Sequence, residues 1–465
     1  MIRFAVVALA AATLAGCASF SPDGGVGEVS ALTKERTGQV VQWHRTQADL
    51  DTVAARVADL LKSPLAPETA VEMALLNNRG LQADFAELGI AEADLVQAGR
   101  LKAPTLSFGR LAGGGALEID RSVMFGILDL LTMPAATGIA RQRFEQAQLR
   151  AATAAVGLAA QARRAYFEAV AAQQLVGYCL QVKEAAEASA DLARRMAVAG
   201  SFSKLDQMRE QAFYADATSQ LARALQQAVA RRERLTRVLG LSAAQVNFQL
   251  PETLPELPAQ VLQPENAEQT ALDTRLDVRL AKSDAETTAK SLGLTNVTRF
   301  VNALDAGYQD KSQSGTPNEH GFLVQVEVPL FDFGGARTAR AQAQYMQAMN
   351  RTAQVAVNAQ SEVRESYAAY RTAYDLAKHY RDEVVPLRQR ISDENLLRYN
   401  GMLIGVFELI ADAREQVSGV TGYVEALRDY WVADTDLQIA LTGGSREPNS
   451  MTSTGATPAA TSAGQ

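Results

Sequence analysis

The chain has few residues of the kinds that most enzymes use for catalysis or metal binding. Its only cysteines are Cys17 and Cys179, and its three histidines, His44, His320 and His379, lie far apart in the sequence. Metal-binding motifs place such residues at short, regular spacings, and none of these spacings is present. A nucleophile elbow and a nucleotide-binding loop are also missing from the sequence. We therefore expect no enzymatic activity, no cofactor and no metal site.

Aromatic residues make up only 6% of the 465 residues, and alanine is abundant in segments such as Ala151–Ala162. No proline occurs between Pro134 and Pro251, or between Pro329 and Pro386. Small residues without proline are typical of long helices that pack closely on one another. The net charge of −7 is small for this length and argues against a nucleic-acid-binding surface. The sequence thus predicts a mainly α-helical protein built from long rods.

Long apolar segments are scarce as well. Phe4–Ala15 follows the basic start of the chain and is too short for a comfortable transmembrane helix. It leads into Leu14–Cys17, which resembles a bacterial lipoprotein cleavage site, so we expect residues 1–16 to be a signal peptide and Cys17 to carry lipid. Ala18 follows, where an aspartate would indicate retention in the inner membrane, and this points to the outer membrane. An ordinary secretory signal with an unrelated cysteine is the alternative.

The same succession of elements occurs twice: a helix, two short strands, and a long helix that reverses at a glycine. Such duplication decides the architecture. We expect a leader at 17–63, repeats at 64–250 and 251–443, a proline-rich linker where the second repeat opens, and a disordered tail at 444–465. The matching segments are Ala74–Leu95 with Ala271–Leu292, Phe125–Arg143 with Val326–Gln342, and Gly200 with Gly401.

Each repeat contains a candidate hairpin in which apolar and polar residues alternate. In the first, strands at 104–111 and 117–128 place Ile119, Val123 and Phe125 on one face, which Arg121 interrupts. In the second, strands at 300–310 and 322–330 flank a polar loop at 311–321. This alternation is typical of transmembrane barrel strands, and it also fits a half-buried hairpin of a soluble sheet.

The number of strands has a consequence if they enter a membrane. A hairpin in lipid leaves backbone groups unpaired at its edges, and only a closed barrel of about eight or more strands removes these edges. The four strands of one chain are too few to close a barrel, whereas three chains supply twelve. Membrane residence therefore predicts a homotrimer whose helical rods extend away from the bilayer.

Several segments resemble a known family when taken in order. Val328–Gly334 enters a long helix, Arg275–Asp277 opens the second repeat, and Tyr399–Gly401 and Ala411–Arg414 frame the second helix reversal. With the duplication, the chain resembles the TolC-type outer-membrane efflux family, in particular its lipid-anchored bacterial members, over about Pro64–Gly443.

The resemblance implies a fold, a function and partners. It implies a trimer with a twelve-stranded outer-membrane β-barrel continued by a long periplasmic α-helical barrel that closes at its tip. The tip would contact a periplasmic adaptor (membrane fusion) protein and, through it, an inner-membrane pump, so that small molecules or ions leave the cell. The substrate stays open among drugs, metals and others. A coiled-coil lipoprotein scaffold or adaptor without a pore is the alternative, and matched hairpins in both repeats favour the channel.

The resemblance also implies residues at the tip. Acidic side chains just beyond the second turn would line the constriction, and Glu408 matches such a position, with Asp412 on the same helix face. Ala411 stands where relatives can carry a second aspartate. Repeated threefold, these acids would form a negative ring that favours cations, although they equally suit a solvated helix face. The candidates are Gly200 and Gly401 at the turns and Asp206, Glu408 and Asp412 beyond them.

Phe331 and Phe333 lie where the last strand passes into a helix, at the expected membrane boundary. Aromatic rings favour that boundary, and packing beneath the sheet is an equal alternative. Asp332, and Asp129 in the first repeat, are expected to help start the following helix.

Overall fold

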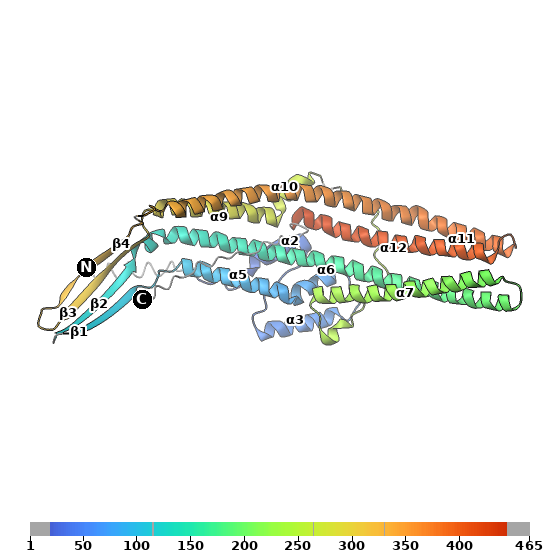
Figure 1. The fold of residues 1–465 in the computed structure, drawn as a ribbon, viewed down its shortest axis with the longest axis horizontal. Helices are drawn as coiled ribbons and strands as arrows, with labels where there is room; N and C mark the ends of the chain where they lie inside the picture. The colour runs from blue at the N-terminus through green and yellow to red at the C-terminus, as the bar shows by residue number, and fades with distance from the viewer. Residues whose placement is uncertain (1–18, 114–115, 264, 330, 444–465) are drawn as a thin grey trace.

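The computed structural model describes residues 19–113, 116–263, 265–329 and 331–443. These residues form an elongated rod with a small sheet at one end and two helix reversals at the other (Figure 1). The predicted signal peptide, Cys17 and the tail at 444–465 lie outside the described residues. The prediction of a mainly helical protein with a small β part is confirmed.

The two repeats contain corresponding elements. The first comprises α4 (Pro67–Asn77), α5 (Arg79–Ala98), β1 (Thr105–Gly113), β2 (Ala116–Gly126), α6 (Ile127–Val198), α7 (Lys204–Leu239) and the short 3₁₀ helix η1 (Ala243–Val246). The second comprises α8 (Ala267–Thr274), α9 (Leu276–Thr298), β3 (Ala303–Gln313), β4 (Glu319–Glu327), α10 (Gly335–His379), the π-helical turn η2 (Tyr380–Val384), α11 (Val385–Asn400) and α12 (Val406–Thr442).

Helix α6 runs along most of the rod. It has 72 residues, which at about 1.5 Å per residue span about 108 Å. Three of its alanines, Ala152, Ala155 and Ala162, are fully buried. A methyl group fills little space, so these positions let helix axes approach closely. The core therefore runs along the rod as a stripe.

Each repeat is closed by hydrogen bonds that we call the helix-junction contacts. Asn78, between α4 and α5, donates through Nδ2 to the carbonyl oxygen of Val238 near the end of α7 (2.9 Å). Arg275, between α8 and α9, donates through Nη1 to the carbonyl oxygen of Ala440 near the end of α12 (3.2 Å). The two junction residues have similar backbone angles, φ −71° and ψ 120° against φ −62° and ψ 133°. The same joint is thus made twice with different side chains.

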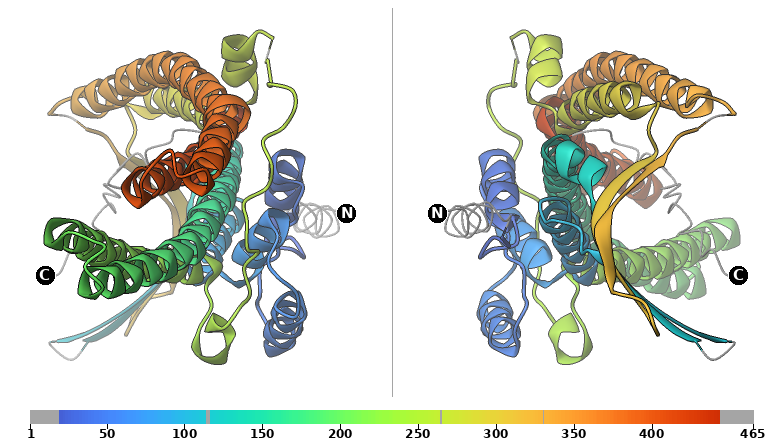
Figure 2. Two further views of the ribbon diagram at one scale, coloured as in Figure 1. Left: turned by 90° about the vertical axis from the view of Figure 1, so that its right-hand side faces the viewer. Right: turned by 90° about the vertical axis from the view of Figure 1, so that its left-hand side faces the viewer.

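The leader is helical where the sequence predicted only a leader segment. Its helices α2 (Val26–Thr37) and α3 (Gln47–Leu60) lie on the outside of the rod (Figure 2). Val29 of α2 and Val57 of α3 are fully buried. Arg36 donates to the carbonyl oxygens of Thr274 (2.9 Å) and Thr442 (3.0 Å). The leader therefore fastens the ends of α8 and α12 together.

The four strands form one curved antiparallel sheet in the order β1-β2-β3-β4 (Figure 2). The two repeats join through β2 and β3, which pair from Glu118 opposite Gln313 to Gly126 opposite Asp305. Strands β3 and β4 extend into 311–321, where the sequence predicted a loop. The strand residues there are all polar or glycine, so they lack the apolar alternation of a strand and resemble a loop in composition.

Candidate functional site

One face of the sheet is apolar and exposed. Residues directly opposite one another on antiparallel strands share a face, and Leu106, Val123, Tyr308 and Phe322 form one such row across all four strands. The rows nearer the helices are also apolar, and Phe322 is 90% exposed. We call this surface the apolar face. Its further rows are Phe125, Ala306 and Val324, and then Leu304 and Val326.

The charged side chains of the opposite, polar face are mostly acidic. Asp120 accepts two hydrogen bonds from Gln309 Nε2 (2.9 Å each), and Lys311 forms an ion pair with Glu118 (2.6 Å). These contacts link β2 to β3 and therefore hold the two repeats in register. In the described strands, the acidic residues of this face are Glu118, Asp120, Asp305, Glu319 and Glu327, and Lys311 is the single base.

The strand-to-helix passage before α10 exposes two aromatic rings, Phe331 and Phe333. The backbone turns here through two residues with positive φ, Phe333 at 48° and Gly334 at 74°. A Cβ at Gly334 would lie 2.3 Å from the carbonyl oxygen of Arg299, so only glycine fits. Asp332 accepts a hydrogen bond from the Gly334 N–H (3.0 Å) and thus caps the start of α10.

The first helix reversal lies at the far end of the rod, between α6 and α7. Gly200 has φ 76°, the left-handed conformation that ends a helix at a glycine. Ser203 begins α7, and its Oγ accepts from the Asp206 N–H (3.1 Å). The Asp206 carboxylate accepts from Ser203 Oγ (2.6 Å) and lies 3.3 Å from Arg209. Asp206 is therefore engaged in starting its own helix.

The second reversal, between α11 and α12, uses a different residue for its left-handed position. Gly401 has φ −80°, and Met402 has φ 60°. Met402 is 93% exposed and the following Leu403 is 77% exposed. This turn therefore presents apolar side chains at the end of the rod.

The two candidate acids of α12 have different surroundings. Glu408 is exposed in the first turn of the helix. Asp412 is 8% exposed, and its Oδ2 has no hydrogen-bond partner among the described residues. Their i, i+4 spacing places both on one helix face, but only Glu408 is accessible to solvent within one chain.

Two features near this end of the rod were not found from the sequence. Arg414 of α12 lies over the ring of Phe213 of α7, with Cζ 4.2 Å from the ring centroid, and so bridges the two hairpins. The π-helical turn η2 interrupts the long helix immediately before Pro386. Pro386 was the sequence signal for this interruption, because a proline ring within a helix displaces the preceding helical turn.

The start of the described chain is held against α5. Ser21 donates through its backbone N and its Oγ to Glu92 Oε1 (2.6 and 2.5 Å), and Glu92 is only 6% exposed. This contact fixes the start of the described chain beside α5.

Within the described ranges, no helix is long and apolar enough to cross a membrane. The same part of the chain contains no cluster of three or more histidine, cysteine or acidic residues with the geometry of a metal site. Cys179 is half-buried on α6, and burial raises the pKa of its thiol, which lowers its reactivity.

The architecture matches solved structures of outer-membrane channels. CusC, described in connection with transmembrane channel formation, is 16% identical over 81% of this chain and 92% of its own, with a TM-score of 0.68. MtrE, the outer-membrane channel of Neisseria gonorrhoeae, is 18% identical over 80% and 88% (TM-score 0.66). VceC, an outer-membrane protein of Vibrio cholerae, is 15% identical over 84% and 97% (TM-score 0.65). No protein-family model and no curated protein matches the sequence. The chain therefore has the fold of these channels.

Proposed function

We propose that this chain is the outer-membrane channel component of a tripartite efflux system, through which small molecules or ions pass from the periplasm or a pump to the exterior. One observation carries the proposal: a sheet with an apolar and a polar face continues directly into a long helical rod. The fold shared with outer-membrane channels supports it. A scaffold or adaptor without a pore would have no use for the two-faced sheet.

We infer that three chains close the barrel. Strands β1 and β4 are the edges of the sheet described, and an edge in lipid is costly because its backbone groups lack partners. Pairing β4 of one chain with β1 of the next would give twelve strands, with the polar face on the lumen and the apolar face on lipid. The helices would continue as a periplasmic α-helical barrel.

The partners follow from the two ends of the assembly. The exposed apolar residues at the helix reversals, including Met402 and Leu403, would contact a periplasmic adaptor protein that connects to an inner-membrane pump. The sheet would contact outer-membrane lipid, and a lipid on Cys17 would anchor the leader. Glu408 and Asp412 would narrow the tip and favour cations, with Asp206 in a supporting position. We propose no covalent chemistry for the channel, since the pump would supply the energy.

Native mass spectrometry of the detergent-extracted outer-membrane protein tests this function. We expect a trimer that carries three lipid adducts and that conducts ions in planar bilayers. A lipidated monomer in mild detergent would contradict the channel and favour the scaffold. The Cys17→Ser variant separates the anchor from the pore: a full yield of outer-membrane trimer would make the lipid dispensable for assembly.

A further inference from the structure

Within the described strands, the apolar face carries charged side chains only at one level, which consists of two adjacent rows. In the described strands, the row Phe108, Arg121, Asp310 and His320 lies next to the wholly apolar row that contains Phe322. Arg110 lies one row farther from the helices, opposite Ile119. From this level toward the helices, the rows of this face are apolar.

The arginines at this level are only partly neutralised. Arg121 Nη1 lies 3.7 Å from Asp310 Oδ1, and its side chain is 59% exposed. Arg110 is exposed, and within the described residues no hydrogen bond or ion pair involves its guanidinium. Two guanidinium groups therefore face one carboxylate. Arg110 and Arg121 are diagonal neighbours across β1 and β2, which places their Cα atoms about 7–8 Å apart.

Their height matches the outer edge of the bilayer core. A strand tilted by about 40° rises about 2.5 Å per residue along the barrel axis. The six steps from Val326 to His320 then span about 15 Å. Val328, two residues farther along the chain, is also exposed and extends the apolar band by about 5 Å. This height approaches the apolar band of about 25 Å in outer-membrane barrels, and an arginine at the margin of that band costs far less free energy than one at the bilayer midplane.

We propose that Arg110 and Arg121 bind the phosphate groups of a phosphorylated glycolipid in the outer leaflet, while its acyl chains lie on Leu106 and Phe322. This inference rests on the proposed function, because it requires the apolar face to meet lipid. A guanidinium binds phosphate through two parallel N–H donors, and two such groups on adjacent strands suit a bisphosphorylated headgroup. The exposed side of Arg121 remains available beside Asp310.

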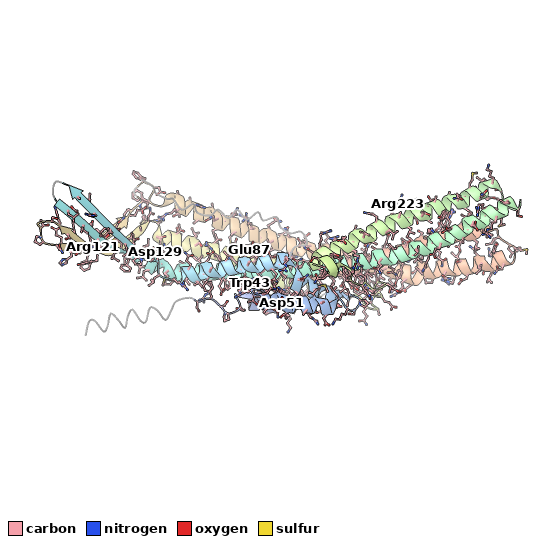
Figure 3. The ribbon with its side chains drawn as sticks, turned by 90° about the horizontal axis from the view of Figure 1, so that it is seen from below. Trp43, Asp51, Glu87, Arg121, Asp129 and Arg223 are labelled. Atoms are coloured by element: carbon pink, nitrogen blue, oxygen red, sulfur yellow. The ribbon has the colours of Figure 1, made fainter. Side chains whose placement is uncertain are left out.

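Native mass spectrometry of the extracted trimer, titrated with bisphosphorylated lipid A, tests the site. The variant Arg110→Gln/Arg121→Gln should bind lipid A about tenfold more weakly than the unaltered chain, for the loss of two charge-assisted contacts. Arg223→Gln is the matched control, since Arg223 is exposed on α7, far from Arg121 along the rod (Figure 3). The affinity of the Arg223→Gln variant for lipid A should be unchanged.

Comparing lipids with different headgroups on the unaltered chain tests the site without relying on the folding of a variant. Dephosphorylated lipid A should bind about tenfold more weakly than the bisphosphorylated form, as should phosphatidylglycerol, which has one phosphate and two acyl chains. The site would be overturned if the unaltered chain bound dephosphorylated lipid A or phosphatidylglycerol as tightly as bisphosphorylated lipid A. It would also be overturned if the double variant bound bisphosphorylated lipid A as tightly as the unaltered chain does. The same spectra report the oligomer: a trimer without headgroup preference removes this inference alone, whereas a monomer removes the channel and the lipid site together.

Discussion

The exchange Arg275→Met tests how the second repeat is held together. Arg275 is the largest fully buried side chain described. Its guanidinium donates to Asp277 (2.7 and 3.0 Å), to Glu362 (2.8 Å) and to the carbonyl oxygen of Ala440 (3.2 Å). It therefore joins α9, α10 and α12 at one point. Methionine fills similar volume and removes the charge together with all of these donors.

The expected loss can be worked out from the surroundings. Removing one partner of a buried ion pair costs about 3–5 kcal/mol, because the other charge stays buried without compensation. The carboxylates of Asp277 and Glu362 are 22% and 23% exposed, so water relieves part of this cost. We therefore expect Arg275→Met to lower the free energy of unfolding by about 3 kcal/mol.

Unfolding in guanidinium chloride, followed by tryptophan fluorescence, measures this loss of stability. Trp431 reports on α12, where its Nε1 donates to the carbonyl oxygen of Pro255 (3.1 Å). Protein concentration must be held constant, since the proposed assembly would contribute to the apparent stability. The double variant Arg275→Met/Asp277→Asn also removes the carboxylate that accepts two of the lost hydrogen bonds, and it should recover about 1 kcal/mol or more. A loss below about 1 kcal/mol in Arg275→Met would refute the reasoning.

Three further predictions concern other parts of the molecule. Gly334→Ala should destabilise the chain by about 1–3 kcal/mol, because φ is 74° and the new Cβ would meet the carbonyl oxygen of Arg299. Gly335→Ala, where nothing lies within 4 Å, should be neutral or stabilising in the same unfolding assay. Burial lowers the pKa of His44 below its ordinary 6.5, so the unfolded chain takes up the proton first as the pH falls. The free energy of unfolding should therefore decrease below about pH 6.5, and this decrease should be smaller in His44→Gln; equal slopes would contradict it. Glu408→Gln should move the reversal potential of the reconstituted pore toward zero in a salt gradient, and an unchanged potential would remove Glu408 from the constriction.

The elements predicted with most detail were those whose pattern repeats along the chain. The alternation around Ile119, Val123 and Phe125 gave the correct faces of β2, since a strand's faces follow directly from its period. Arg121, which interrupts that pattern, has its counter-charge on Asp310 of the other repeat. That pairing depends on the register between β2 and β3, and no local pattern contains it.

The tip shows where local patterns fail. The left-handed position of the second turn is occupied by Met402, although Gly401 is the residue suited to it by conformational freedom. Helix periodicity places Glu408 and Asp412 on one face, yet it does not report that Asp412 is covered. Arg275 was noticed as part of a familiar segment, and its burial among acids from distant helices became visible only in the folded chain.

The helix-junction contacts show that two equivalent joints have been built from unlike residues, asparagine in one repeat and arginine in the other. Because both repeats belong to one polypeptide, the proposed ring of three chains would present its two kinds of reversal in strict alternation. A partner that surrounds the tip would therefore meet a threefold surface with six positions of two types. Mutations can change one type while leaving the other as it was, so each set of three can diverge on its own.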